Sequence, residues 1–289
     1  MQRTKPILVL AVCATVSACD ERPQSLIICH NANCAHATNP FEDDTLASLT
    51  DSLELTYLGR TTMDGVELDT IWDRQGARCL FGHDFAHIFD PAETGMQAAE
   101  LVAAHLRKPT DFVSWGGNRF FVKIELKREV TALNDPHTEE ERLAHLACAY
   151  DMVDVLRAAA ADASRELEIM FESEDVELVR GLPRHPRWPG KDPDDRTRLR
   201  LIAQVQSTEL VLTDLTSLTT NDDDDGIDIL SFHTSRLPDG LQQSFYALDA
   251  SLMLWMLDAS LESLYAMGTY HPEYVITGEA QLFRRWEEF

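Results

Sequence analysis

The chain has 289 residues, of which 44% are hydrophobic and 26% are charged. This length suits one large domain and is short for two, and the hydrophobic content is too high for a disordered chain. The 49 acidic residues outnumber the 25 basic ones, which gives a formal net charge of −24. A surface of that sign repels nucleic acid and anionic lipid headgroups, so the composition excludes nucleic acid as a partner.

Residues 1–18 have the pattern of a signal peptide. Arg3 and Lys5 precede an apolar run at 7–12, and the small residues before Cys19 in VSAC resemble the lipobox of bacterial lipoproteins. The run is shorter than the roughly 20 apolar residues that a membrane-spanning helix needs. By this resemblance Cys19 becomes the acylated first residue of the mature chain, followed by a short linker to residue 25.

Cleavage after residue 18 removes two basic residues and no acidic one, which leaves a mature chain of net charge −26. We therefore expect a protein of the bacterial cell envelope that is lipid-anchored to the membrane through Cys19 and faces the periplasm. The alternative is an ordinary secretory signal with an incidental cysteine at this position.

Four further cysteines remain in the mature chain, at positions 29, 34, 79 and 148. An oxidising compartment favours disulfide formation, and we expect Cys34 to pair with Cys79 because both are expected in loops near the same face. An alternative is a zinc cluster of Cys29, His30, Cys34 and His36, although these spacings match none of the usual ligand pairs.

Apolar or β-rich runs alternate with helical patterns along the chain. The runs lie at 26–32, 65–71, 119–127, 167–173, 199–206, 227–233, 252–257 and 274–277. Eight strands separated by helices within one domain, residues 26–289, predict an α/β fold of the (β/α)₈ TIM barrel type. A doubly wound open sheet is the alternative, but no glycine-rich fingerprint supports it.

Helical periodicity appears between the strand-like runs. One predicted helix face combines Leu46, Leu49 and Leu53, and a second, preceded by a Thr138–Glu141 capping box, comprises Leu143, Leu146, Tyr150 and Val153. Shorter helical patterns follow at 207–218, 238–248 and 258–267. The Pro-rich segment 181–198 is interpreted as a long loop and a candidate lid, and the acidic run 221–226 as a solvated turn.

Charged residues gather where the first three predicted strands end. His30 closes the first run, Glu67 and Asp69 share one side of the second, and Glu125 and Lys127 share one side of the third. His83 follows the second strand. In a barrel, catalytic groups lie at the C-terminal ends of strands, so these residues predict one site. Carboxylates that converge with histidines and a lysine suit an anionic substrate, a hard divalent cation and proton transfer.

At these residues the chain resembles the glycerophosphodiester phosphodiesterase family of TIM barrels. The family pattern has a His at the end of the first strand, an acidic-Thr helix start, Glu-Leu-Asp, His-Asp and Glu-Ile-Lys. The counterparts here are His30, EDDTLASL at 42–49, Glu67-Leu68-Asp69, His83-Asp84 and Glu125-Leu126-Lys127. Trp255 and the closing segment EYVITGEAQLF are also similar to the family.

The resemblance implies hydrolysis of a glycerophosphodiester or a related small phosphodiester. His30 and His83 would be general acid and base, and Glu67, Asp69 and Glu125 would bind one divalent metal ion, Ca²⁺ or Mg²⁺. Lys127 and Asn31 would contact the substrate phosphate, and Trp255 would line the substrate pocket.

Two departures from the family pattern bear on the substrate. Asn31 and Ala32 replace the family's Arg-Gly after the first histidine, and Gly278-Glu279-Ala280 replaces a motif after the last strand. An uncharged Asn31 cannot supply the bidentate phosphate contact of an arginine. A sphingomyelinase-D-like or lysophospholipase-D-like phosphodiesterase, acting on a lysophospholipid, is therefore a second interpretation, and a catalytically silent anchored binding barrel is a third.

Overall fold

The computed structural model describes residues 25–36, 43–83, 93–108, 117–127, 138–173, 176–188, 196–205, 227–237, 250–255, 258 and 260–286. Cys19, the linker before residue 25, the helical patterns at 207–218 and 238–248 and the acidic run 221–226 lie outside these residues. Within the described part, no helix is long and apolar enough to cross a membrane.

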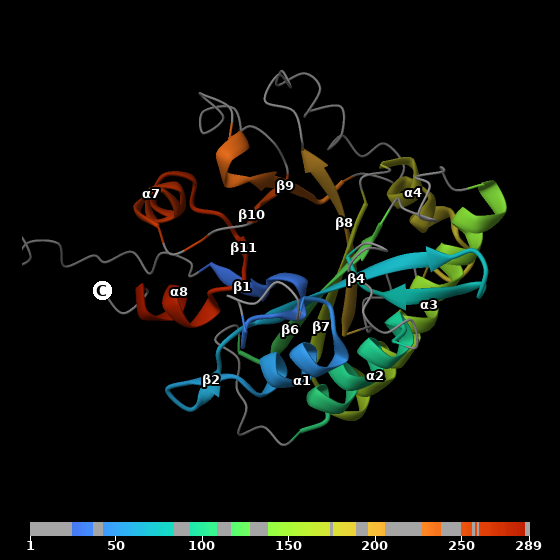
Figure 1. Cartoon of the computed structure of the whole chain (residues 1–289), viewed down its shortest axis with the longest axis horizontal. Coiled ribbons are helices and arrows are strands. Elements are labelled where there is room, and N and C mark those ends of the chain that lie inside the picture. Colours follow the sequence, from blue (N-terminus) through green and yellow to red (C-terminus); the bar gives the residue numbers. More distant parts are fainter. Residues whose placement is uncertain are drawn as a thin grey trace, which may run out of the picture.

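Eight parallel strands form a closed barrel (Figure 1). Around the ring they are β1 (Leu26–Cys29), β4 (Gly65–Asp73), β6 (Arg119–Leu126), β7 (Glu166–Glu172), β8 (Thr197–Val205), β9 (Ile229–His233), β10 (Ser251–Trp255) and β11 (Tyr274–Thr277). Strand β1 pairs with both β11 and β4, which closes the ring. The predicted TIM barrel is confirmed, and each of the eight predicted runs overlaps one of these strands.

The alternation of side chains along the strands separates two apolar layers. One set fills the barrel interior, namely Ile28, Phe121, Met170, Ile202, Ile229, Met253, Tyr274 and Ile276. Residues of the opposite parity, such as Ile27, Val66 and Ile124, pack outward in the cluster that includes helix residues. Gly65 permits the close contact of β4 with β6, since a Cβ there would lie 2.4 Å from the carbonyl oxygen of Phe121.

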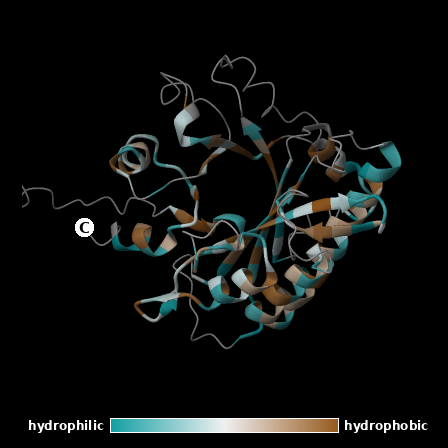
Figure 2. Ribbon diagram, viewed as in Figure 1, coloured by the Kyte–Doolittle hydropathy of each residue, from teal (hydrophilic) through white to brown (hydrophobic). Residues whose placement is uncertain are grey.

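Helices surround the barrel (Figure 1). They are α1 (Leu46–Glu54), α2 (Gly95–Leu106), α3 (Glu139–Asp162), α4 (Val176–Gly181), α7 (Leu261–Tyr270) and α8 (Ala280–Trp286), with short 3₁₀ turns η1 (His30–Ala32), η3 (Leu182–Arg184) and η4 (Thr234–Arg236). Figure 2 shows hydrophobic residues on the strands and on the helices that pack against them. This is the arrangement that buries one face of each amphipathic helix.

The structure confirms three predicted helices and corrects details of them. Leu49 and Leu53 of α1 are buried, and the Thr138–Glu141 capping box begins α3. Leu143, expected on the buried face of α3, is 52% exposed. The predicted helix at 258–267 corresponds to α7, whereas α2, which begins with a Thr94–Gln97 capping box, was not predicted.

An antiparallel hairpin and a small ribbon add to the barrel. Strand β5 (Arg78–Phe81) turns back along β4, and β2 (Thr56–Tyr57) pairs with β3 (Arg60–Thr61). The hairpin brings Cys79 against α3, where it forms a disulfide with Cys148. Cys34 is paired instead with Cys29, five residues earlier. The predicted Cys34–Cys79 pairing is therefore wrong, because β5 packs on α3 and not on the loop after β1.

Two parts of the predicted lid are described: residues 181–188 are attached to the outside of the barrel, and residues 197–198 already belong to β8. The first part begins with the 3₁₀ turn η3, and Tyr150 of α3 donates a 2.6 Å hydrogen bond to the carbonyl oxygen of Leu182. Arg187 forms ion pairs with Asp151 and Asp154 of α3. These contacts hold the segment against α3, so its described portion is not a free loop; residues 189–195 lie outside the description.

Candidate active site at the C-terminal mouth of the barrel

The C-terminal ends of β1, β4 and β6 bring most of the predicted site residues together. His30 begins the turn that follows β1, and Lys127 directly follows β6. Asp69 of β4 is in register with Glu125 of β6, so both carboxylates point into the barrel at the same level. His83, which follows β5, is exposed, and its charge is close enough to lower the pKa of Asp69.

A lysine that was not predicted lies at the centre of the cluster. The Nζ of Lys123, on β6, contacts Glu67 of β4 and Glu172 of β7 and lies 2.8 Å from Oε2 of Glu125. Burial alone would lower the pKa of this lysine, but the carboxylates of Glu125, Glu172 and Glu67 more than offset it and raise the pKa well above its usual range. Lys123 is therefore a permanently charged group inside the barrel.

Lys127 connects the two remaining carboxylates of the predicted metal triad. Its Nζ lies 2.6 Å from Oε1 of Glu125 and 3.0 Å from Oδ2 of Asp69. The contact with Asp69 has the distance of an ion pair without the angles of a hydrogen bond, so within the described residues both oxygens of Asp69 lack a hydrogen-bond partner. Asp69 is completely buried, and such an atom requires an explanation.

The turn after β1 places a further acidic residue beside the site. The backbone N–H of Asn31 donates a hydrogen bond of 3.0 Å to Oε2 of Glu67. The Asn31 side chain donates one of 3.3 Å to Oδ2 of Asp43. Asp44, whose backbone donates to the carbonyl oxygen of Asn31, is 4% exposed, and neither of its carboxylate oxygens has a hydrogen-bond partner among the described residues. Asn31 thus orients carboxylates, and the phosphate contact predicted for it stays a prediction.

This turn is strained and is closed by a disulfide. Asn31 and Ala32 have φ values of 48° and 52°, a region in which a non-glycine residue costs roughly 1–2 kcal/mol. Ala32 keeps this conformation although it replaces the glycine of the family pattern. The Cys29–Cys34 disulfide spans the turn, so both cysteines are unavailable as metal ligands and the alternative of a zinc cluster is excluded.

The electrostatics of the mouth indicate an excess of negative charge. Among the described residues, Asp44, Glu67, Asp69, Glu125 and Glu172 are buried carboxylates that face the two lysines. Burial, with the neighbouring carboxylates, raises the pKa of Asp69 to about 6 and that of Glu172 to about 7 despite the opposing lysines. Burial and the charge of Asp69 also raise the pKa of Asp44 well above its usual range. A bound cation would relieve this repulsion.

His30 has the environment of a proton acceptor. Its Nε2 lies 3.8 Å from Oε2 of Glu67, and its side chain is 22% exposed. Burial lowers the pKa of His30, and Lys123 and Lys127 act in the same direction, against the opposing charge of Glu67. The imidazole is therefore neutral at neutral pH, the form that can accept a proton.

The opposite side of the mouth carries an aromatic pair. Trp255 ends β10 and packs edge-on against His233, at the end of β9, with 4.9 Å between the ring centroids. The Trp255 residue is half-buried, but its Nε1 atom is buried and has no hydrogen-bond partner in the described part of the chain. Trp255 thus lies across the mouth from the charged cluster, and its role in a substrate pocket stays a prediction.

Sequence patterns gave a signal for the missed residues. Lys123 has the same strand parity as Glu125 and Lys127, and Glu172 ends the fourth predicted strand, where catalytic groups of a barrel are expected. One oxygen from each of Glu67, Glu125 and Glu172 lies within 4.8 Å of the others, a spacing that suits a metal ion. The predicted triad of Glu67, Asp69 and Glu125 is therefore part of a larger cluster.

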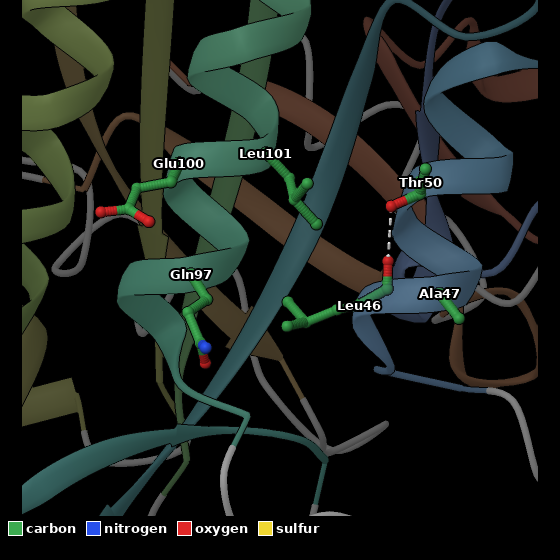
Figure 3. A pocket seen from close by; sticks show the side chains of 6 residues that line it. All are labelled: Leu46, Ala47, Thr50, Gln97, Glu100 and Leu101. Carbon is green, nitrogen blue, oxygen red and sulfur yellow. Dashed lines mark hydrogen bonds between the residues drawn. The ribbon is translucent and has the colours of Figure 1, made fainter.

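A groove on the outside of the barrel is separate from this cluster. It has a volume of about 480 Å³ and lies between α1 and α2. Figure 3 shows Leu46 of α1 and Leu101 of α2 pointing toward each other across it. The lining is mainly apolar and contains no pair of groups for acid–base chemistry, so the charged mouth is the candidate active site.

The comparisons with known proteins concern the fold. No protein-family model matches the chain, and no curated protein matches its sequence. A phosphodiesterase from Oleispira antarctica, solved with the product sn-glycerol-3-phosphate, is 12% identical over 92% of this chain and 98% of that one, with a TM-score of 0.59. A glycerophosphodiester phosphodiesterase from Parabacteroides distasonis is 13% identical over 92% and 98%, with a TM-score of 0.56.

A calcium-dependent phosphoinositol-specific phospholipase C from a Pseudomonas species is 8% identical over 89% of this chain and 89% of that one, with a TM-score of 0.50. In all three cases the sequence identity is low, but the structural similarity extends over most of each chain. The chain therefore has the barrel fold found in glycerophosphodiester phosphodiesterases and phosphoinositol-specific phospholipase C.

Proposed function

We propose that the chain hydrolyses a phosphodiester of the glycerophosphodiester type at the C-terminal mouth of the barrel. The observation that carries this proposal is the arrangement of His30 and the carboxylates of Glu67, Asp69 and Glu125 around one mouth, with His83 beside Asp69. The neighbours in fold include phosphodiesterases and a phospholipase C, which agrees with this reaction class. His30 and His83 are the proposed proton-transfer pair, one for the nucleophile and one for the departing alkoxide.

The donor set of the mouth fits a divalent cation. Hard cations such as Ca²⁺ and Mg²⁺ prefer carboxylate oxygens, and Asp69 has two buried oxygens without hydrogen-bond partners. Asp69, Glu67 and Glu125 would hold the ion, as the sequence predicts. When bound, such an ion neutralises phosphoryl oxygens and so lowers the barrier to attack on phosphorus.

The chain's own residues supply the remaining parts of the reaction. Lys127 is 12% exposed at its side chain, whereas Lys123 is only 3% exposed, so Lys127 is the lysine positioned to contact a phosphoryl oxygen. His30, neutral because burial lowers its pKa, accepts a proton. The aromatic face of Trp255 receives the leaving alcohol, which excludes water from part of the pocket.

The test of this function is a substrate panel. Purified protein with Ca²⁺ or Mg²⁺ is incubated with glycerophosphodiesters, lysophospholipids and sphingomyelin, and the released alcohol and phosphate monoester are quantified. Turnover of a glycerophosphodiester is expected. Preferred turnover of a lysophospholipid or sphingomyelin would favour the phospholipase-D-like alternative, and no turnover of any diester would contradict the proposed enzyme and favour a binding barrel.

We also propose that the protein is anchored to the envelope membrane through Cys19 and faces the periplasm. The proposal rests on the signal-like residues 1–18 and the lipobox-like VSAC. Replacing Cys19 by Ala should release the protein into the soluble fraction, because acylation then has no acceptor. Membrane fractionation measures this, and an unchanged membrane fraction would contradict the anchor.

A further inference from the structure

Three strands surround the Nζ of Lys123 with carboxylates. Glu67 comes from β4, Glu125 from β6 itself and Glu172 from β7. The side chain of Lys123 is 3% exposed, and those of the three acids are between 1% and 6% exposed. Lys123 therefore reaches neither solvent nor a substrate at the mouth, and its partners are internal.

The barrel register explains how one lysine reaches all three acids. Lys123 is level with Glu67 on the neighbouring strand, and Glu125, two residues later, is level with Glu172 on the other neighbour. The long side chain of Lys123 extends from the level of Glu67 toward the level of Glu125 and Glu172. Its ammonium group therefore lies between these two levels of carboxylates.

The same three acids have the spacing of a metal site. One oxygen from each lies within 4.8 Å of the others, and calcium ligands at about 2.3–2.6 Å are separated by up to about 5 Å across the ion. The ammonium group and a divalent ion would therefore occupy the same space. Glu172 also retains a buried oxygen, Oε1, without a hydrogen-bond partner among the described residues.

We propose that Lys123 is a resident cation that takes the place of a divalent ion between Glu67, Glu125 and Glu172. The cation between these three acids is then covalently attached, and any exchangeable ion binds toward Asp69, whose Oδ2 already lies 3.0 Å from Nζ of Lys127. This assignment concerns the chain's charge arrangement and goes beyond the proposed hydrolysis, on which it does not depend.

The resident cation also positions the Glu67 carboxylate. This second inference rests on the proposed function. Glu67 is held between Lys123 on one oxygen and the Asn31 backbone on the other, and the latter oxygen faces Nε2 of His30. Lys123 therefore fixes the carboxylate beside the proposed proton-transfer histidine. It acts through Glu67 and is a positioning residue.

Calcium stoichiometry tests the proposal. Full-length wild type and Lys123→Met are stripped with EDTA, dialysed and titrated with Ca²⁺ in a calorimeter. Lys123→Met should bind one Ca²⁺ ion per chain more than wild type, because the three acids are freed, whereas Lys123→Arg, which keeps the charge, should bind the same number as wild type. Adding Glu172→Gln to Lys123→Met should abolish the additional ion.

The result that would overturn the proposal is equal stoichiometry for wild type and a folded Lys123→Met protein. If Lys123→Met is unfolded without metal, its thermal unfolding is measured with and without Ca²⁺: recovery of a folding transition in Ca²⁺ but not in K⁺ supports the proposal, and failure to recover contradicts it. Loss of diester hydrolysis with an additional Ca²⁺ ion would leave this assignment intact, and absence of hydrolysis in wild type would contradict only the proposed function.

Discussion

Two buried charged clusters lie at opposite ends of the same barrel, and their hydrogen bonding differs. At the N-terminal end, the guanidinium group of Arg200 donates hydrogen bonds to Glu168 (3.1 Å) and to the hydroxyl oxygens of Tyr274 (2.6 Å) and Ser251 (2.8 Å). The Tyr274 hydroxyl in turn donates a hydrogen bond of 2.8 Å to Glu168. At the C-terminal mouth, oxygens of Asp44, Asp69 and Glu172 have no hydrogen-bond partner among the described residues.

The difference separates a structural network from a binding site. A buried polar network stabilises a fold only when its members are satisfied, and unpaired buried groups cost free energy. The N-terminal network meets that condition with the chain's own residues. The mouth does not, and it retains a surplus of carboxylates, which is the arrangement expected where a cation and an anionic substrate complete the site.

The largest expected effect is on catalysis at the mouth. His30→Ala should reduce kcat by about 10²–10⁴-fold while leaving the melting temperature nearly unchanged, because general acid or base catalysis is lost without loss of a packed core residue. His83→Ala should act in the same way. Steady-state kinetics and thermal unfolding measure both quantities.

His36→Ala is the matched control for this comparison. His36 lies in the same loop, but it is exposed and pairs with Asp51 at 2.9 Å, away from the carboxylate cluster. Its replacement should leave kcat within about twofold, since exposed pairs contribute little. Near-normal turnover by His30→Ala, or an equal loss in His36→Ala, would contradict the assignment of His30.

A change in the N-terminal network should affect stability and not catalysis. Arg200→Met leaves Glu168 buried without its cation, which should lower the free energy of unfolding by about 3–5 kcal/mol. Urea unfolding measures this, with kcat determined on the folded variant. A lowered kcat in the folded variant would mean that the two ends of the barrel are coupled.

The two disulfides should also differ in whether their removal affects stability alone or kcat as well. In the chain-entropy model, removing the Cys79–Cys148 bridge, which spans 69 residues, should cost about 4 kcal/mol, and removing Cys29–Cys34, which spans five, about 2 kcal/mol. Replacement of each pair by serine tests this. Only loss of Cys29–Cys34 should also lower kcat, because it closes the turn that carries His30. Equal kcat values for the two double variants would contradict that role.

Stability should also depend on pH through Glu172. Its pKa is raised from 4.5 to about 7 in the folded state, so its favourable contribution is fully present below pH 4.5 and is lost as the pH rises through about 7. In EDTA, wild type should therefore lose up to about 3 kcal/mol relative to Glu172→Gln across this range.

Urea unfolding at pH 4.5, 6 and 7.5 measures the difference between the two proteins. Glu166→Gln is a control on the same strand, because Glu166 is exposed and pairs with Arg119 outside the mouth. A stability difference between wild type and Glu172→Gln that is independent of pH would refute the raised pKa of Glu172.

The strands and the predicted triad were accessible from the sequence because both depend on local spacing. Short β-rich runs marked each strand, and residues two apart, such as Glu67 with Asp69, must share a face of a strand. Lys123 obeys the same parity, but only the pairing of β6 with β4 and β7 shows that its ammonium group is enclosed by acids.

The missed features depend on contacts between distant segments. The Cys79–Cys148 disulfide follows from packing of the β4–β5 hairpin on α3, which no local pattern specifies. Asp44 lies in the helix-start motif EDDTLASL, but its burial results from the left-handed turn at Asn31 and Ala32. Sequence spacing therefore predicts which residues share a face, whereas tertiary packing decides which charges remain unpaired.

The mouth should bind an anionic diester only when a divalent cation offsets its carboxylates. Like charges a few ångströms apart repel by about 4 kcal/mol at an effective dielectric of 20, so the metal-free mouth should exclude a phosphodiester. The direct measurement is calorimetric titration of a non-hydrolysable glycerophosphodiester into Ca²⁺-loaded and EDTA-treated protein. We predict binding to the loaded protein and none to the stripped one; equally tight binding to both would contradict the requirement for a cation.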